Sequence, residues 1–545
     1  MEGIVASARL ISLTLERFKS YKQATRIDLS PLTVILGRNN SGKSSIIQAL
    51  LLLKQTLALP RPDVPLHLEG YVDALHLREL TYGWPAPGAD VPGPRIGLRW
   101  ASRINVHATL EQSRAPDPLS EMAKASLSSL LASVELESNE LVTELLLDYA
   151  ELEGRVVLQE LTLTFYSSAK APEPTGRFTL TRQIDGIYKC VLFSASGEPE
   201  TASGLQVELD HFIPYLFVDR RNVDQRDRQQ FLHTAFHILF YKPLDDLKAL
   251  LAGFAYLGAM RTLPPSLYRP ATAPPDDIGV SGEYAAQMLH ARRADRVHYL
   301  PPLHVDGDRI EIPAKVRSLP LADAVNDVLD SLGVGTSLRI DDVKDIGFRL
   351  LFGNASFQHV GRGLSYLVPV IQLGLITDPL RFRPLLDDMP LEDYEQACPG
   401  YTHCAFEEPE AHLHPKVQTR LAHWLVSLAM SRRQILVETH SDHLVRRLRG
   451  LAARAEPGSP LERWLLKNVR VLQVEQHDGE SIVKSAGLTP QGGLEDWPAD
   501  FMDEATDEER SIYYASLDKP AEPAPEPPEL PAIEHDVGEE PDVGP

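Results

Sequence analysis

The apolar and polar positions near the start of the chain follow two different patterns. Residues 10–18 and 25–29 alternate apolar and polar side chains, which predicts half-buried antiparallel strands. Residues 32–36 (LTVIL) form a short, mostly bulky apolar run, as expected for a strand buried on both faces. Apolar residues then recur at helical spacing from Ile46 to Leu53, so a buried strand leads through a short loop into a helix.

The same patterns predict the elements of the remaining chain. Loops rich in Pro and Gly fill 60–95. Further strands are expected at 95–112, 155–166, 177–182, 187–193, twice within 337–352, at 469–475 and at 480–486. Helices are expected at 118–152 (with a leucine stripe at 127–134), at 229–258, from Gly282 through Leu289, and at 321–333.

The loop between the first buried strand and its helix carries a phosphate-binding pattern. Residues 37–44 read GRNNSGKS, which is G-x-x-x-x-G-K-S. Glycines allow the tight turn and the close approach of backbone N–H groups to phosphate oxygens, and the helix N-terminus adds attraction. Lys43 is predicted to reach the β- and γ-phosphates and Ser44 to ligate Mg²⁺. The predicted nucleotide-binding set is Gly37, Asn39, Asn40, Ser41, Gly42, Lys43, Ser44 and Ser45.

Two later strands end in polar groups suited to the same chemistry. The apolar stretch Cys404–Phe406 is followed by Glu407 and Glu408. A carboxylate in that place can hold the Mg²⁺ hydration shell, and a second can orient the attacking water, so Glu407 is assigned to the metal and Glu408 to the water. A second buried strand, 434–438, leads to His440, which can reach the γ-phosphate.

Composition limits the class of protein. With 545 residues, two to four domains or one large elaborated domain are possible. The three cysteines are scattered, which favours a reduced cytoplasmic setting, and no apolar run is long enough to span a bilayer. The formal net charge of −22 argues against a basic coat for nonspecific nucleic-acid binding, although a local basic groove stays possible. The tail 518–545, rich in Pro and Glu, is expected to be disordered.

Three segments together resemble a known group of ATPases. GRNNSGKSS, FEEPEAHLHP and VETHSDHL are similar to the ABC-type ATPases of the SMC, RecF and OLD group, and most closely to OLD-like bacterial AAA ATPases. YLGAMR at 256–261 and the segment 492–501 resemble one subgroup of them. The resemblance implies an α/β fold: an ABC-type P-loop NTPase with a mixed central sheet, an antiparallel β-subdomain and a helical insertion.

The resemblance also implies cofactors, partners and boundaries. ATP and Mg²⁺ are the expected cofactors, and a homodimer or higher oligomer the expected assembly. A signature segment at 360–366 would cover the ATP of another subunit through Gly361, Gly363 and Ser365. The expected divisions are an N-terminal ATPase lobe (1–115), an α+β insertion (116–330), a C-terminal ATPase lobe (331–470), a C-terminal module (471–517) and the tail (518–545).

Several functional questions stay open at this stage. We expect an ATP hydrolase acting as the sensor or regulator of a separate, nuclease-like effector in bacterial anti-phage defence, because no fused nuclease follows His440. The alternative is a RecF-like DNA-repair ATPase that binds DNA through arginine clusters at 220–221, 292–293 and 446–449. Arg261 is predicted to be a surface arginine or a phosphate contact. Thr81, His76 and Arg78 are equal candidates for sensing Mg²⁺ and water.

Overall fold

The computed structural model describes a defined part of the chain, which divides into two units. The described residues are 8–87, 91–103, 140–168, 171, 173–194, 200–201, 205–218, 236–307, 309–381, 383, 387–495, 511 and 514. Nearly all of them belong to the compact unit Met1–Asp496, and the second unit is Trp497–Pro545. The predicted tail, residues 118–139 of the predicted helix and the segment 497–501 lie outside the described residues.

A six-stranded sheet forms the centre of the first unit. In order across the sheet, its strands are β12 (Ala255–Leu257), β21 (Thr402–Glu407), β22 (Arg433–Glu438), β3 (Leu32–Gly37), β23 (Val469–His477) and β24 (Glu480–Gly487). The first five are parallel and β24 is antiparallel to β23, which confirms the mixed central sheet. The phosphate-binding strand β3 is buried along its apolar run, as its sequence predicts.

Helices connect these strands and cover the sheet. They are α1 (Lys43–Ala58), α10 (Pro415–Met430), α11 (Asp442–Arg454) and α12 (Pro460–Asn468). The helix α1 starts directly after Gly42, and α11 starts after Ser441, whose hydroxyl accepts the N–H of Leu444. Short loops join β3 to α1, β21 to α10 and β22 to α11, so the residues that follow these strands are held close to the edge of the sheet.

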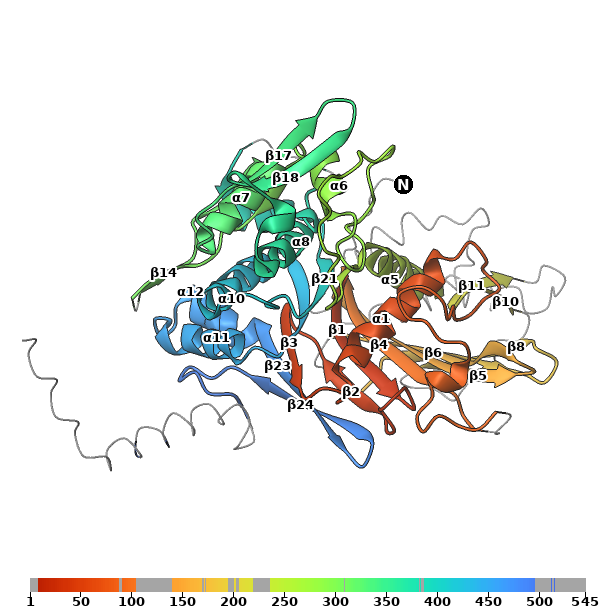
Figure 1. The fold of residues 1–545 in the computed structure, drawn as a ribbon. Coiled ribbons are helices and arrows are strands. Elements are labelled where there is room, and N and C mark those ends of the chain that lie inside the picture. Colours follow the sequence, from red (N-terminus) through yellow and green to blue (C-terminus); the bar gives the residue numbers. More distant parts are fainter. Residues whose placement is uncertain are drawn as a thin grey trace, which may run out of the picture. The chain divides into compact units, whose positions relative to one another are not determined.

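An eight-stranded antiparallel sheet lies beside the central one (Figure 1). Its strands, in order, are β2 (Thr25–Asp28), β1 (Arg9–Glu16), β4 (Arg95–Arg103), β5 (Glu140–Leu152), β6 (Arg155–Tyr166), β7 (Gly176–Arg182), β8 (Tyr188–Ser194) and β9 (Glu200–Thr201). A hairpin of β10 (Leu205–Asp210) and β11 (Ile213–Val218) follows. The sheet shares one apolar core with α1 and with α5 (Lys242–Gly253). In this core, the indole N–H of Trp100 on β4 donates to Pro243 O on α5 at 3.0 Å. The antiparallel β-subdomain is therefore confirmed, and β4 and β5 are paired in it as neighbours.

The predicted helix at 118–152 is wrong over its last thirteen residues. Glu140–Leu152 is the strand β5, paired on both sides with β4 and β6. Leu145, Leu146 and Leu147 are adjacent, so the local sequence does not choose between a helical and an alternating pattern. The alternating burial of β5 depends on its two strand neighbours, which local periodicity does not reveal. The prediction at 229–258 is likewise wrong at its end, because 255–257 is strand β12.

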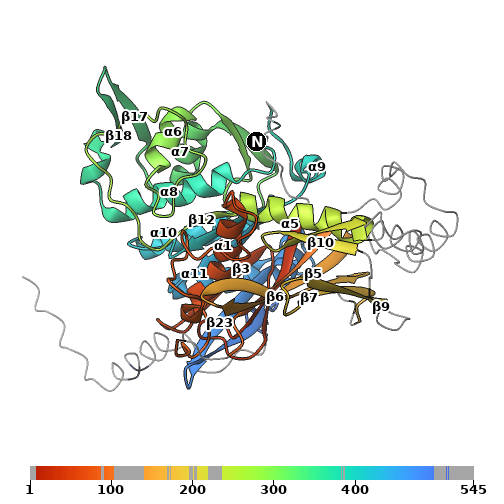
Figure 2. The ribbon, with the colours of Figure 1, turned by 90° about the vertical axis from the view of Figure 1, so that its right-hand side faces the viewer.

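A third part of the unit gathers away from the eight-stranded sheet (Figures 1 and 2). Its helices are α6 (Ala285–Ala291), α7 (Leu321–Ser331), α8 (Arg362–Ile376) and α9 (Leu391–Ala397). Its strands are β13 (Arg296–Tyr299), β14 (His304–Asp306), β15 (Arg309–Glu311), β16 (Lys315–Pro320), β17 (Leu338–Val343), β18 (Gly347–Phe352), β19 (Ala355–Ser356) and β20 (Met389–Pro390). The helix predicted at 321–333 and the two strands predicted within 337–352 are confirmed. Among the described residues, no helix is both long enough and apolar enough to cross a bilayer.

Candidate functional site

Three segments that are far apart in sequence meet at one edge of the central sheet. The parallel strands β3, β21 and β22 all end there, and each is followed by residues that the sequence selected. The register places Glu407 beside Glu438, and Glu438 beside Ile35, two residues before Gly37. The carboxyl edge of the sheet thus brings the phosphate-binding loop, the acidic pair and the His440 segment together.

The glycines of the loop are required by close packing as well as by their backbone angles. Gly37 and Gly42 have φ angles of 153° and 99°, which disfavour a side chain. A Cβ on Gly37 would lie 2.2 Å from Val474 O, and one on Gly42 would lie 2.4 Å from Ser481 Oγ. Since these contacts come from the neighbouring strands β23 and β24, the loop is held in shape by the sheet behind it.

Polar side chains support the loop from behind. The Ser481 hydroxyl donates to Ser41 O at 2.6 Å, and the Tyr21 hydroxyl donates to Gly42 O at 3.0 Å. Ser481 also lies 2.6 Å from the Ser20 hydroxyl. Sequence reasoning missed these residues, since nothing local connects Ser20 with Ser481. They fix the backbone that a phosphate group would contact.

The loop residues divide by exposure. Asn39 and Asn40 are exposed, with Asn40 at a φ of 64°, whereas Ser41 and Ser45 are buried. Lys43 is only 4% exposed, and its ammonium group donates to Arg38 O at 2.9 Å. Burial lowers the pKa of Lys43, and the carboxylates of Glu438, Glu408 and Glu407 oppose that shift. Lys43 therefore lies within the field of all three carboxylates.

The acidic pair consists of two glutamates in different environments. Glu407 is largely enclosed: its Oε2 accepts the N–H of Ala259 at 3.3 Å, and burial raises the pKa of its carboxyl. Glu408 has a φ of 45°, and its side chain is 41% exposed. Its backbone N–H donates to Glu438 O at 2.8 Å. A positive φ is costly for a residue other than glycine, and such backbone strain is common at functional sites.

His440 faces Glu408 across the site. Its Nε2 lies 3.9 Å from Glu408 Oε1, and burial together with Lys43 lowers the pKa of its ring. The segment that carries His440 is held by Glu410, a buried carboxylate. Glu410 Oε1 accepts the Thr439 hydroxyl at 2.5 Å and the His440 N–H at 3.0 Å. Glu410 received no role from the sequence, although it stands in the quoted segment FEEPEAHLHP.

Glu438 was also missed, and it is the carboxylate in contact with the loop. The Ser44 hydroxyl donates to Glu438 Oε1 at 3.0 Å, and Lys43 Nζ lies 3.9 Å from that oxygen. Burial raises the pKa of Glu438 to about 7, with repulsion from Glu407 as the second cause. The available signal was its place at the end of a buried strand, the same position that singled out Glu407.

Arg261 is not a surface arginine, as the structure buries it to 7% exposure. Its Nη2 donates to Glu407 O at 2.8 Å, while Nε and Nη1 are buried without a partner. Burial lowers the pKa of this guanidinium to about 10. The predicted alternative, contact with a phosphate, stays a prediction. Thr81, one of the three candidates for sensing Mg²⁺, is buried and donates its hydroxyl to Leu77 O at 2.9 Å.

The residues present fit a bound Mg²⁺ ion. The donor set consists of the Ser44 hydroxyl and two neighbouring carboxylates, which are the oxygen ligands that Mg²⁺ prefers. Glu407 Oε1 and Glu438 Oε2 are both buried without a hydrogen-bond partner. Within the described ranges, no group of three or more His, Cys, Asp or Glu side chains is arranged to hold a metal. The protein therefore supplies only part of a coordination sphere, as expected where phosphate oxygens and water complete it.

The predicted signature segment forms the start of α8. Gly361 and Arg362 are exposed, whereas the buried Ser365 donates its hydroxyl to Arg362 O at 2.9 Å. A Cβ on Gly363 would lie 2.5 Å from His412 O, so this glycine lets α8 approach the turn that follows the acidic pair. The contacts predicted from Gly361, Gly363 and Ser365 to a second subunit's ATP stay predictions.

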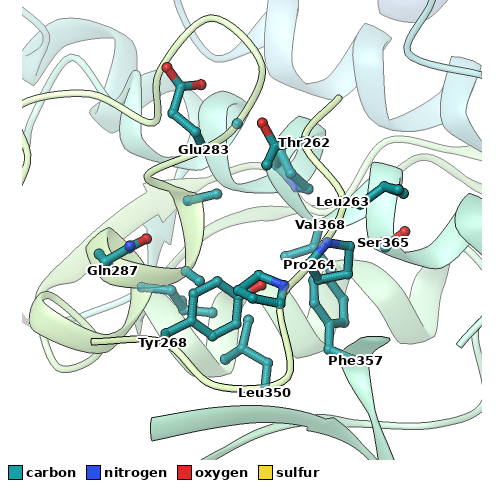
Figure 3. A pocket seen from close by; sticks show the side chains of 16 residues that line it. Thr262, Leu263, Pro264, Tyr268, Glu283, Gln287, Leu350, Phe357, Ser365 and Val368 are labelled. Atoms are coloured by element: carbon teal, nitrogen blue, oxygen red, sulfur yellow. The ribbon is translucent and has the colours of Figure 1, made fainter. Parts of the chain in front are cut away.

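A cavity of about 160 Å³ adjoins this segment (Figure 3). It lies between α6, α8 and the loop 262–265, and its lining is mostly apolar, with Tyr268, Phe357 and Val368 facing inward. Ser365 contributes to the wall, while Lys43 and the carboxylates around it do not. The phosphate-binding edge is therefore separate from this cavity.

Sequence comparison identifies the two segments that carry this site. The family model described as "AAA ATPase domain" matches residues 9–77 and 399–445, which contain the phosphate-binding loop, the acidic pair and His440. No curated protein matches the chain.

Solved structures with a similar arrangement include three SMC head domains. One is an SMC head bound to the C-terminal winged-helix domain of ScpA (14% identity, 88% of this chain, 98% of that chain, TM-score 0.36). The SMC head domain from Thermotoga maritima has 12% identity over 87% of this chain and 98% of its own, with a TM-score of 0.30. The third is an SMC head with an extended coiled coil, bound to a ScpA domain and derived from Pyrococcus furiosus. It has 13% identity over 93% of this chain and 100% of its own, with a TM-score of 0.34.

These TM-scores are low, so the fold assignment rests on features of the chain itself. A phosphate-binding loop follows a central parallel strand, an antiparallel sheet precedes and accompanies it, and the acidic pair ends a neighbouring strand. The chain therefore has an α/β fold with the phosphate-binding loop of a P-loop NTPase, and its match to the AAA ATPase domain supports an ATP-binding ATPase.

Proposed function

We propose that this chain hydrolyses ATP with Mg²⁺, and that two copies join head to tail across two bound nucleotides. The observation that carries the proposal is the convergence of Lys43, Glu408 and His440 at one strand edge. These residues come from three separate segments. The charge of Lys43 lowers the pKa of His440, and the Glu408 carboxylate acts to raise the pKa of Lys43. Such convergence is typical of phosphoryl-transfer sites, where positioning and charge do most of the catalytic work.

Each residue has a role that follows from its environment. The loop N–H groups and Lys43 bind the phosphates, and bound Mg²⁺ supplies charge neutralisation. The exposed carboxylate of Glu408 orients a water molecule and accepts its proton. His440, whose lowered pKa keeps its ring neutral near pH 7, contacts the terminal phosphate and so reports its presence. Ser44 and Glu407 hold the metal.

The dimer completes the site from outside. The start of α8 is exposed at Gly361 and Arg362, so it is available to a second copy of the chain. We assign Gly361, Gly363 and Ser365 to contacts with the nucleotide of the partner subunit. Nucleotide then shifts the population toward the closed dimer, and hydrolysis releases it.

The variant Glu408→Gln tests this function. It should bind ATP as the wild type does while turnover falls about 10²- to 10⁴-fold, because the general base is lost. The closed dimer should accumulate with ATP and Mg²⁺, as light scattering coupled to size exclusion would show. The matched control is Glu456→Gln, an exposed glutamate between α11 and α12, which should leave turnover and dimerisation unchanged. Normal turnover in Glu408→Gln would refute the assigned role.

The proposed cellular role is the sensor or regulator subunit of a bacterial anti-phage defence system. It rests on the resemblance of the ATP-site segments to OLD-like ATPases. The proposal requires a separate effector protein, nuclease-like in activity. Co-purification of the tagged chain with the products of neighbouring genes would support it, and a chain that purifies alone would count against it.

A RecF-like role on DNA is the second candidate. Three of the arginines predicted to bind DNA already contact other side chains of this chain. Arg293 pairs with Asp342 at 3.3 Å, and Arg446 pairs with Asp442 at 3.2 Å. Arg447 donates to the His423 ring at 2.6 Å. Residues 220–221 lie outside the described part of the chain. DNA-stimulated ATP hydrolysis with a steep dependence on salt would favour this role instead.

A further inference from the structure

Glu438 occupies a place in the site that the proposed function does not use. It ends β22 between the acidic strand β21 and the phosphate-binding strand β3. Its Oε1 accepts the Ser44 hydroxyl at 3.0 Å, so it touches the residue assigned to Mg²⁺. It is only 6% exposed, which excludes a solvated carboxylate on the surface.

Glu407 and Glu438 form a pair of carboxylates on adjacent strands. They are register partners in a parallel pair, and like charges side by side on neighbouring strands destabilise a sheet. Glu438 Oε2 is buried with no hydrogen-bond partner. Glu407 Oε1 is likewise buried without one, although the Tyr256 hydroxyl interacts with the Glu407 carboxylate. A buried charged oxygen without a partner costs free energy, so an arrangement of this kind favours the binding of a cation.

The cations of the chain that lie nearby do not fill this need. Lys43 Nζ lies 3.9 Å from Glu438 Oε1, but it donates to Arg38 O and is assigned to the phosphates of the nucleotide. Arg261 donates to the backbone oxygen of Glu407 rather than to its carboxylate. Neither group donates a hydrogen bond to Glu438 Oε2, which is buried without a partner.

We propose that Glu438 is a protein ligand of the divalent cation, and that with Ser44 and Glu407 it lets this chain bind the ion before any nucleotide is present. This inference deepens the proposed function and rests on it. In a P-loop site the metal is ordinarily held by the loop hydroxyl and one acidic residue, with phosphate oxygens completing the shell. The second buried carboxylate adds charge and a ligand from the protein itself. Hard, carboxylate-binding ions such as Mg²⁺ and Mn²⁺ suit the three oxygen donors.

Binding of Mn²⁺ to the full chain without nucleotide tests the proposal. The free Mn²⁺ signal in electron paramagnetic resonance gives the dissociation constant for wild type, Glu438→Gln and Glu410→Gln. Loss of a supporting carboxylate at a metal site typically lowers affinity about 10- to 100-fold, and we expect that loss for Glu438→Gln. Glu410→Gln should stay within about twofold of wild type, because Glu410 is equally buried but holds Thr439 and His440 instead of Ser44.

A second readout separates metal loss from misfolding. Mn²⁺ should raise the melting temperature of the wild type and of Glu410→Gln, but raise that of Glu438→Gln much less. Without metal, the melting temperature of Glu438→Gln should be no lower than that of the wild type, because the variant removes a buried like charge. Wild-type-like Mn²⁺ affinity in Glu438→Gln, or no Mn²⁺ binding by the wild type without nucleotide, would overturn the proposal.

The proposed function can fail separately from this inference. Binding of fluorescent ATP in the presence of a chelator reports the nucleotide site without the metal, and Glu438→Gln should retain it. Absence of ATP binding in the wild type would remove the ATPase proposal, and the Mn²⁺ comparison between Glu438→Gln and Glu410→Gln would still decide whether Glu438 binds a cation.

Discussion

Two buried polar clusters lie in the same compact unit, and they differ in how completely their atoms are paired. One joins β13, α9 and β22 through Arg433, His298, Asp378 and Tyr394. The Arg433 guanidinium donates to Gly374 O at 3.0 Å and to His298 O at 2.6 Å. Asp378 Oδ2 accepts His298 Nδ1 at 2.7 Å, and Asp378 Oδ1 accepts the Tyr394 hydroxyl at 3.1 Å.

The other cluster is the phosphate-binding edge of the central sheet. There Glu407, Glu438 and Arg261 each keep at least one buried polar atom without a partner. Glu438 ends the strand that Arg433 begins, so a single six-residue strand carries both kinds of cluster.

The difference distinguishes buried charged groups that stabilise the fold from buried charged groups that are suited to bind a ligand. A buried ionic network whose atoms are all paired holds elements together, and breaking one member is costly. Buried polar atoms left unpaired in a native protein call for a ligand, an ion or a catalytic role. The predictions below test this contrast, starting with the largest expected effect.

Arg433→Met should be the most destabilising change. It would leave Asp378 buried without the Arg433 guanidinium and would remove bonds to three backbone oxygens, at a cost of about 3–5 kcal/mol in unfolding free energy. Urea denaturation followed by circular dichroism would measure it. The control is the neighbouring Arg432→Met, a partly exposed arginine paired with Glu395 at 3.3 Å, which should cost about 0–1 kcal/mol. Equal costs for the two variants would contradict the structural role of the network.

Two lysines on α1 should respond in opposite ways. Lys43→Ala should lose ATP affinity by about 1.5–3 kcal/mol or more, through the lost charged bonds to phosphate, with little change in stability. Lys54→Ala should keep ATP affinity but lose about 1–2 kcal/mol of stability, because Lys54 Nζ donates to Ala252 O at 3.3 Å and to Phe254 O at 2.5 Å at the end of α5. Titration with fluorescent ATP and thermal denaturation measure the two effects. A Lys43→Ala protein that binds ATP normally would end the ATP-site assignment.

Glu410→Gln should have the smallest effect, and on turnover alone. The amide oxygen still accepts hydrogen bonds from Thr439 and His440, but these bonds are now to a neutral group. We expect them to be weaker by about 1 kcal/mol. We expect kcat to fall about fivefold while KM for ATP is unchanged, since the variant shifts His440 and leaves the loop intact. Steady-state kinetics would show this split, and a rise in KM without a fall in kcat would contradict the positioning role.

The sequence predicted the elements that depend on local chemistry. The buried strand, the glycine-rich loop and the helix after it are adjacent in sequence, and each follows from residue type and spacing. The acidic pair and His440 were found because each follows an apolar strand. Where two patterns were locally possible, as in Glu140–Leu152, the prediction was wrong because the neighbouring strands decide the outcome.

The sequence by itself determined that a phosphate-binding loop is present and that two later strands end in acidic residues. It identified Lys43, Ser44, Glu407, Glu408 and His440 as candidate site residues. Only the tertiary structure decided which other groups share that edge: it placed Glu438 against Ser44, buried Arg261 beside Glu407, and set Ser20 and Ser481 behind the loop. The physical reason is that strand order and register bring together residues up to several hundred positions apart. No local pattern indicates such a pairing, whereas the conformation of a glycine-rich loop follows from the few residues that form it.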